Sequence, residues 1–211
     1  LIYSGDFASP EQIIPPEGII DENGERIPWE LCATMNNHWG YCNFDHEYKQ
    51  ADMLIRKLVE CTSKGGNMIL NVGPDAKGRI PKESVQILEE IGAWMERNGE
   101  SIYGCGISEI PKPEWGRYTQ NADTIYAHVY EAPLGALPLY GIAPDRLEKV
   151  YYLTDGSEMT RGEAWNTVLF QDVAFVSLGA NPVFTYPLPD PIDTVLKIKI
   201  KKGSRLCPGM D

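Results

Sequence analysis

The spacing of apolar and polar positions predicts strands alternating with helices up to about residue 105. Residues 27–35 and 67–72 are short, mostly apolar runs, which are typical of strands buried in a parallel sheet. Asn43 or Asp45 can cap the start of a helix between these runs, and the glycine pair 65–66 can end it. That helix carries one apolar stripe at helical spacing, made of Ala51, Leu54, Ile55, Leu58 and Val59.

A second helix is predicted to begin at Pro81 and to end at the Asn-Gly pair 98–99. Its inner face is predicted to consist of Val85, Leu88, Ile91 and Met95. Strand, helix, strand and helix in this order predict parallel strands covered by helices. A barrel of eight such units takes about 250 residues. Residues 1–105 are therefore either a quarter of a barrel or a small open sheet.

The second half of the chain has a different pattern, in which short strands follow one another with Gly, Pro and Asn between them. Regular spacing of this kind favours an antiparallel β-sandwich over residues 106–211. The candidate strands are 116–120, 124–130, 137–142, 147–153, 173–178 and 194–200.

Composition and charge exclude several classes of function. The 211 residues carry a net charge of -11, whereas a nucleic-acid surface needs clustered Lys and Arg. The five cysteines include no CxxC pair and are an odd number, so we expect free buried thiols and no disulfide framework. The three histidines have no metal spacing, so no zinc site is indicated. No apolar run approaches the roughly 20 residues that span a bilayer. The densest basic group alternates as on a solvated strand face and consists of Lys197, Lys199, Lys201 and Lys202.

Two loops carry candidate chemistry. Glu11 follows a proline in the stretch DFASPE, and Phe7 with the apolar run 13–15 can supply the apolar surroundings that keep a general acid protonated. Trp39 follows the strand 27–35, and barrel enzymes hold their chemistry at the carboxyl ends of strands. An aromatic ring there can pack against the apolar face of a sugar. Glu30 lies at the opposite end of the strand and is interpreted as structural.

Five segments of the first half carry a resemblance to a known family. They are GDFASPEQ (5–12), PWELC (28–32), HWGY (38–41), SKGGNMILNVGP (63–74) and NGESIYG (98–104). Their order and spacing resemble the end of the catalytic domain of glycoside hydrolase family 29, the α-L-fucosidases. The second half resembles the C-terminal domain of that family in architecture only.

The resemblance implies an α/β plus all-β fold. Residues 1–105 are expected to be the last strands and helices of a (β/α)8-type barrel, and residues 106–211 a β-sandwich domain. It also implies hydrolysis of terminal α-L-fucose with retention of configuration, by two carboxyl groups about 5–5.5 Å apart. Glu11 takes the place of the general acid/base, and Trp39 that of the aromatic residue that meets the fucose methyl group. The expected partner is a fucosylated oligosaccharide or glycoconjugate, with no metal or organic cofactor.

The family's nucleophile, an Asp on an earlier strand, has no counterpart in these 211 residues. We therefore expect the chain alone to be inactive, and to self-associate or to need the missing N-terminal part of the barrel. The alternative is a non-catalytic remnant whose sandwich binds carbohydrate through aromatic side chains. Its candidates are Trp115, Tyr118, Tyr126, Tyr130 and Trp165.

Overall fold

The computed structural model describes residues 2–3, 6–163 and 167–201. It divides into two compact units, Leu1–Glu96 and Arg97–Asp211. The expectations that concern Gly5, Trp165, Lys202 and Cys207 lie outside the described residues. No helix in the described part is long and apolar enough to cross a membrane.

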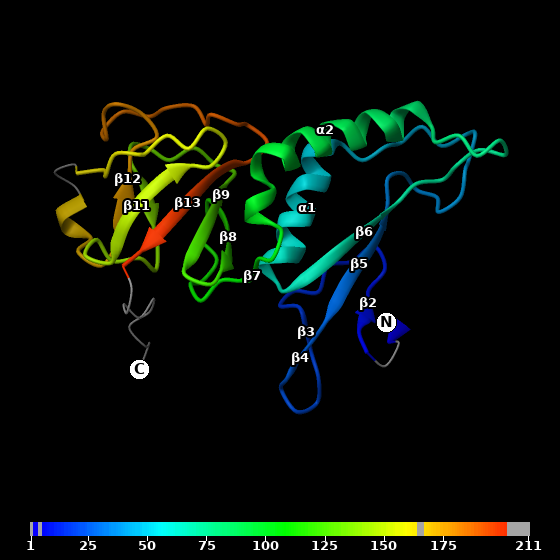
Figure 1. Cartoon of the computed structure of the whole chain (residues 1–211), viewed down its shortest axis with the longest axis horizontal. Coiled ribbons are helices and arrows are strands. Elements are labelled where there is room, and N and C mark those ends of the chain that lie inside the picture. Colours follow the sequence, from blue (N-terminus) through cyan, green and yellow to red (C-terminus); the bar gives the residue numbers. More distant parts are fainter. Residues whose placement is uncertain (1, 4–5, 164–166, 202–211) are drawn as a thin grey trace. The chain divides into compact units, whose positions relative to one another are not determined.

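The first unit is built around a sheet with the strand order β1-β2-β5-β6. Its strands are β1 (Ile2–Tyr3), β2 (Ala8–Ser9), β5 (Trp29–Thr34) and β6 (Gly66–Asn71). β2, β5 and β6 pair in parallel, as predicted, and β1 is antiparallel to β2. Figure 1 shows β5 and β6 as neighbouring arrows of one direction. A small hairpin of β3 (Ile19–Ile20) and β4 (Arg26–Ile27) lies between β2 and β5 in the sequence.

Helix α1 (Ala51–Ser63) packs against β6, and its predicted apolar stripe is confirmed. Ala51, Leu54, Ile55 and Val59 are buried, and Leu58 is partly buried. The predicted caps Asn43 and Asp45 are wrong, because the helix begins after Gln50, which makes no side-chain cap. Asp45 instead binds loop groups, as described below. The predicted glycine stop is confirmed, since Gly65 follows the helix with φ 73°.

Helix α2 (Lys82–Asn98) begins directly after Pro81, close to its predicted start. Its predicted inner face is wrong in part, because Val85 and Leu88 are each 39% exposed. The helix is rotated toward a neighbouring stripe, whose buried members are Ser84, Ile87, Trp94 and Asn98. Apolar residues occupy two adjacent helical stripes here, and packing against α1 and the sheet selects between them.

The two faces of the first sheet differ. Trp29, Leu31 and Ala33 lie on one face of β5 and are buried. On β6, Met68 packs against this core, whereas Ile69 points to the other face and is 46% exposed. The prediction that 67–72 is a fully buried strand is therefore wrong for this face. Successive strand side chains alternate between faces, and on the second face Asn67 and Ile69 of β6 are exposed, whereas Thr34 at the end of β5 is buried.

Gly66 allows the closest approach within this unit. A Cβ at this position would lie 2.3 Å from the indole ring of Trp29, a distance that side-chain atoms do not tolerate. Trp29 is buried beneath it and donates a 3.3 Å hydrogen bond to the carbonyl of Lys64. The glycine pair therefore ends α1 and also lets β6 pass over a tryptophan.

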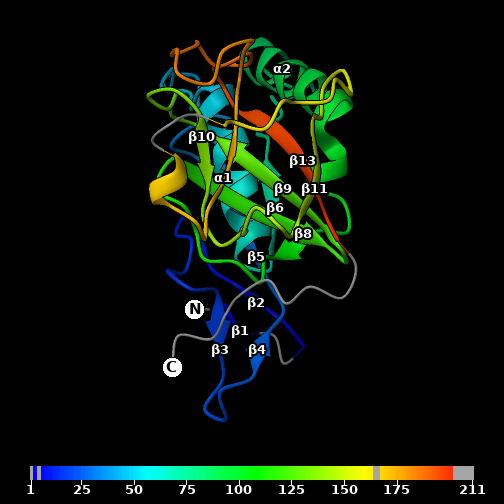
Figure 2. The ribbon, with the colours of Figure 1, turned by 90° about the vertical axis from the view of Figure 1, so that its left-hand side faces the viewer.

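Among the described residues, the second unit contains a five-stranded antiparallel sheet and a two-stranded one. The larger sheet has the order β11-β13-β9-β8-β7 and the smaller one pairs β10 with β12. Figure 2 shows β11, β13, β9 and β8 of the larger sheet side by side. Six of these strands match predicted segments, whereas β7 (Gly106–Ile107) was missed. The six are β8 (Gly116–Asn121), β9 (Thr124–Val129), β10 (Leu137–Leu139), β11 (Leu147–Tyr152), β12 (Ala174–Val176) and β13 (Thr194–Ile200).

The aromatic candidates of the second unit are mostly inside it. Trp115, Tyr118 and Tyr126 are buried, and Tyr130 is partly buried. Trp115 packs edge-on against Tyr118 with ring centroids 5.3 Å apart. Buried rings stabilise the core and cannot stack on a sugar in solution.

The basic group near the C-terminus was predicted to lie on a solvated strand face. Lys197, Lys199 and Lys201 lie on β13 or directly after it, on a solvated strand face. Lys197 pairs with Glu100, and Lys199 lies 5.6 Å from the ring centroid of Tyr151. The described cysteines Cys32, Cys42, Cys61 and Cys105 are free thiols, but only Cys61 is buried, so the expectation of buried thiols is wrong for the other three.

The interior of the second unit holds one buried ionisable pair. His128 and Asp193 are fully buried, and Nδ1 of the histidine lies 2.7 Å from Oδ2 of the carboxylate. Its Nε2 lies 3.1 Å from Oγ1 of Thr119, whose hydroxyl donates to the carbonyl of Ser101. This chain of hydrogen bonds joins β8, β9 and the start of β13.

Candidate functional site

Three parallel strands of the first unit end at one edge of the sheet, and the candidate residues follow these ends. Glu11 comes two residues after β2, and Trp39 lies in the loop after β5. Asn71 is the last residue of β6. Because parallel strands present their carboxyl ends at the same edge, side chains distant in sequence meet there.

The main chain around Glu11 continues along β5 beyond the end of β2. Glu11 forms a parallel bridge with Cys32, whose N–H donates to the carbonyl of Pro10 at 3.0 Å. Gln12 then takes φ 60°, a left-handed conformation that is uncommon for residues other than glycine. Its side-chain amide donates to Oγ1 of Thr34 at 2.9 Å, so the strained residue is tied to the end of β5.

Glu11 and Trp39 are brought into direct contact across 28 positions of sequence. The indole Nε1 of Trp39 donates a 2.9 Å hydrogen bond to Oε1 of Glu11. Both side chains are exposed, Trp39 by 39%. The side chain of Asn71 donates to the carbonyl of Trp39 at 2.7 Å and holds the loop from the end of β6. Within the described residues, Oε2 of Glu11 receives no hydrogen bond and remains open to a ligand.

The apolar surroundings predicted for Glu11 do not enclose it. Ile13 is 72% exposed and Phe7 is 39% exposed, and the carboxyl group of Glu11 lies at the surface of the first unit. The expectation that these side chains wall off the carboxyl is therefore wrong for the described chain. Within the same run, Ile14 packs instead against the core around Trp29 and Leu31.

Lys49 anchors the loop that carries Trp39. Its ammonium group donates to the carbonyls of Thr34 and Asn36, at 2.8 and 3.0 Å, and to Oγ1 of Thr34 at 3.2 Å. These acceptors mark the point where β5 ends and the loop begins. Burial lowers the pKa of Lys49, while the nearby charge of Asp45 opposes that shift.

Asp45 closes the same loop from its other end. Its carboxylate lies 2.7 Å from Nδ1 of His38 and accepts the N–H groups of Asn37 and Glu47 at 2.8 and 3.1 Å. The hydrogen bond from His38 is the main reason that the pKa of Asp45 falls to about 2. Asp45 is therefore a loop-closing residue and not the helix cap that the sequence predicts.

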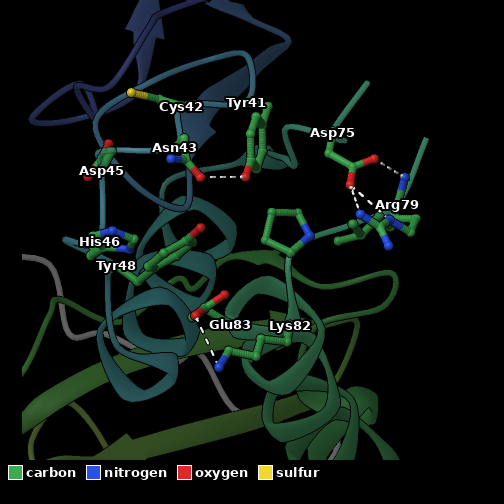
Figure 3. A pocket seen from close by; sticks show the side chains of 12 residues that line it. Tyr41, Cys42, Asn43, Asp45, His46, Tyr48, Asp75, Arg79, Lys82 and Glu83 are labelled. Carbon is green, nitrogen blue, oxygen red and sulfur yellow. Dashed lines mark hydrogen bonds and ion pairs between the residues drawn. The ribbon is translucent and has the colours of Figure 1, made fainter. Parts of the chain in front are cut away.

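A cavity of about 470 Å³ opens beside this loop. Figure 3 shows its two walls, one from the loop after β5 with Tyr41 and Tyr48, the other from the segment before α2 with Asp75 and Arg79. Gly73 lets these walls approach, because a Cβ there would lie 2.7 Å from the main chain of Gly40. The cavity is a feature that sequence reasoning missed.

Glu30 lies away from this edge, in agreement with its structural interpretation, and accepts a 3.3 Å hydrogen bond from Ser9. The residues that position the candidate pair, namely Gln12, Lys49 and Asn71, were not predicted. Gln12 and Asn71 belong to the segments GDFASPEQ and SKGGNMILNVGP, which resemble the family, and this resemblance was the signal that could have identified them. Within the described chain, no group of three or more His, Cys, Asp or Glu side chains is arranged to hold a metal ion.

The sequence and the structure of this chain were compared with those of known proteins. Residues 2–100 match the family model described as "Alpha-L-fucosidase". This range contains the whole candidate site. The matched residues identify the first half of the chain as similar to the α-L-fucosidases. An α-L-fucosidase of Dictyostelium discoideum is 41% identical over 112 residues, which are 50% of this chain and 24% of that protein. The human tissue α-L-fucosidase is 28% identical over 134 residues, 59% of this chain and 27% of that protein.

Solved structures extend the similarity to both units of the chain. The α-L-fucosidase isoenzyme 1 from Paenibacillus thiaminolyticus is 47% identical with a TM-score of 0.88, over 95% of this chain and 46% of that one. A family 29 α-L-fucosidase from Bacteroides thetaiotaomicron, trapped as a covalent intermediate with 2-fluoro-fucosyl fluoride, is 28% identical with a TM-score of 0.72. It is matched over 93% of this chain and 43% of its own. The chain thus spans about a quarter of the curated relatives and less than half of these solved chains.

Proposed function

We propose that the chain carries the acid/base side of a retaining α-L-fucosidase, which removes terminal α-L-fucose from glycans once its barrel is complete. The observation that carries this proposal is the exposed carboxylate of Glu11, held by Trp39 where three parallel strands end. In this role Glu11 first protonates the leaving oxygen and then takes a proton from the attacking water. The ring of Trp39 lines the place of the fucose and offers an apolar face to its methyl group.

We further propose that residues 1–105 are the last strands and helices of a (β/α)8-type barrel, and that residues 106–211 are its β-sandwich domain. The parallel order β2-β5-β6 and the exposed face of β6 support this assignment. Parallel sheets are normally covered on both faces. Ile69 on the exposed face would point into the closed barrel.

On this proposal the 211 residues alone do not hydrolyse fucosides. A retaining mechanism needs a second carboxylate within about 5–5.5 Å of the first, and the resemblance places that nucleophile on an earlier strand. The test is an assay of the purified chain with 4-nitrophenyl α-L-fucoside. The same assay is run on a completed chain, in which the N-terminal part of the Paenibacillus enzyme precedes this sequence. Activity of the 211 residues at an ordinary enzyme rate would overturn the proposal.

The role of Glu11 is tested in the completed chain. Glu11→Gln keeps the size of the side chain but removes its proton transfer, and kcat should fall by about 10²- to 10⁴-fold. Glu22→Gln is the matched control, because this carboxylate is exposed in the turn between β3 and β4. Equal activity of the two variants would remove Glu11 from the mechanism.

We also propose that the chain associates with itself or with the missing part of the barrel. β6 lies at the edge of its sheet, and unpaired strand edges with exposed apolar side chains recruit further strands. Light scattering of the purified chain should show dimers or larger species whose share rises with concentration. A stable monomer at all concentrations would argue against this part of the proposal.

A further inference from the structure

Asn71 joins the end of β6 to the loop that carries Trp39. Its side-chain amide donates a 2.7 Å hydrogen bond to the carbonyl of Trp39, across 32 positions of sequence. The chain that follows makes a second contact with this loop, because a Cβ at Gly73 would lie 2.7 Å from the carbonyl carbon of Gly40. Two neighbouring contacts therefore fix the main chain at Trp39 relative to β6.

The end of β6 is itself fixed in the sheet and the core. Asn71 is paired in parallel register with Thr34 of β5. Leu70 and Val72, on either side of it, pack against the buried cluster to which α1 and α2 contribute. Because successive strand side chains alternate between faces, the side chain of Asn71 lies on the other face from that of Leu70. Its amide thus starts from a fixed backbone, whereas Trp39 lies in a loop outside the regular elements.

The hydrogen bond from Trp39 gives the two oxygens of Glu11 different roles. Oε1 accepts the indole N–H at 2.9 Å, and Oε2 receives no hydrogen bond within the described residues. In a protonated carboxyl group the carbonyl oxygen is the better acceptor, so an N–H on Oε1 places the transferable proton on Oε2. Proton transfer depends on the distance and direction from this oxygen to the reacting atom.

We propose that Asn71 is a positioning residue for proton transfer by Glu11, and that it acts by holding the indole of Trp39 against Oε1. This inference rests on the proposed function. In the first step the proton on Oε2 moves to the leaving oxygen, which keeps both electrons of its broken bond to the sugar, while the nucleophile of the missing part forms an ester with the sugar. In the second step Oε2 takes a proton from the water that displaces the nucleophile.

The test in the completed chain compares two leaving groups through kcat/KM, which covers the reaction up to loss of the leaving group. 4-Nitrophenolate leaves readily without a proton, whereas benzyl alcohol needs the proton of the acid/base. Asn71→Ala should lower kcat/KM by about tenfold for benzyl α-L-fucoside and by less than about threefold for 4-nitrophenyl α-L-fucoside. Asn67→Ala is the matched control, because Asn67 is exposed on the same face of β6 near its opposite end. It should leave the ratio of the two values unchanged.

A double-mutant cycle separates this role from a general loss of structure. Glu11→Gln has no proton to deliver, so Asn71→Ala added to it should change kcat/KM for the benzyl fucoside by less than about twofold. Equal losses for both leaving groups, or full multiplication of the two single effects, would overturn the inference. If Glu11→Gln itself leaves activity intact, the proposed function fails. An effect of Glu11→Gln with none of Asn71→Ala removes this inference alone.

A second measurement uses the 211-residue chain and needs no catalysis. The Nε1–H resonance of Trp39, identified in NMR spectra by its loss in Trp39→Phe, reports the hydrogen bond to Glu11. Asn71→Ala should move this resonance toward its position in Glu11→Ala, and Asn67→Ala should leave it in place. An unmoved resonance in Asn71→Ala would contradict the proposal. If circular dichroism shows that this variant is unfolded, Asn71→Asp decides, because it keeps the size of the side chain but removes the donor.

Discussion

Lys49→Met should destabilise the first unit and loosen the loop that carries Trp39. Methionine keeps the length of the side chain but removes an ammonium that donates to two main-chain carbonyls and one hydroxyl. Hydrogen bonds from a charged donor contribute about 1.5–3 kcal/mol each when measured singly. Three bonds from one group are not additive, and burial already lowers the pKa of Lys49 and costs part of this gain. We therefore expect a loss of about 2–4 kcal/mol in the free energy of unfolding.

Urea denaturation followed by tryptophan fluorescence gives this value, and hydrogen exchange of a peptide covering residues 36–48 reports the loop. Lys57→Met is the matched control, because Lys57 lies on α1 in a half-exposed pair with Glu60 at 3.0 Å. Such a pair contributes about 0.2–1 kcal/mol. If Lys49→Met costs no more than Lys57→Met and exchange in the loop is unchanged, the anchoring role of Lys49 is refuted.

Three further predictions concern stability. Asp193→Ala should cost about 3–5 kcal/mol in urea denaturation, because it leaves His128 buried without its carboxylate. Gln12→Gly should be more stable than Gln12→Ala in the same assay by about 1 kcal/mol, since both lose the side-chain bonds but only alanine keeps the strain at φ 60°. Asp45 has a pKa lowered from 3.8 to about 2, so its contribution should be complete above about pH 5 and should be lost as the pH falls through about 2. The urea midpoint is measured as a function of pH. In Asp45→Asn, the decrease in the midpoint that the protonation of Asp45 causes should be absent.

Local patterns in the sequence correctly predicted the elements that bury a single apolar face or stripe. The apolar stripe of α1 and six strands of the second unit were found because each has one periodicity and clear turn residues on either side. Helix α2 was placed correctly but rotated wrongly. Val85 and Leu88 compete with Ile87 and Trp94 for the interior, and only tertiary packing decides between them.

The candidate site was predicted in its residues but not in its geometry. Glu11 and Trp39 were named from their segments, whereas the hydrogen bond between them depends on parallel pairing of β2 with β5 and on a loop of irregular backbone. The loop anchors Lys49 and Asp45 have no local signature. Their partners are main-chain groups that become neighbours only after the chain has folded.

The stereochemistry of azide rescue tests the assignment of Glu11 as acid/base most directly. In the completed chain, Glu11→Ala is assayed with 4-nitrophenyl α-L-fucoside and sodium azide, and the configuration of the fucosyl azide is read by NMR. Azide needs no general base, so it should attack the covalent intermediate and give the α-anomer, with activity restored. The β-anomer would mean that azide replaces a missing nucleophile, and the absence of any rescue would equally contradict the assignment.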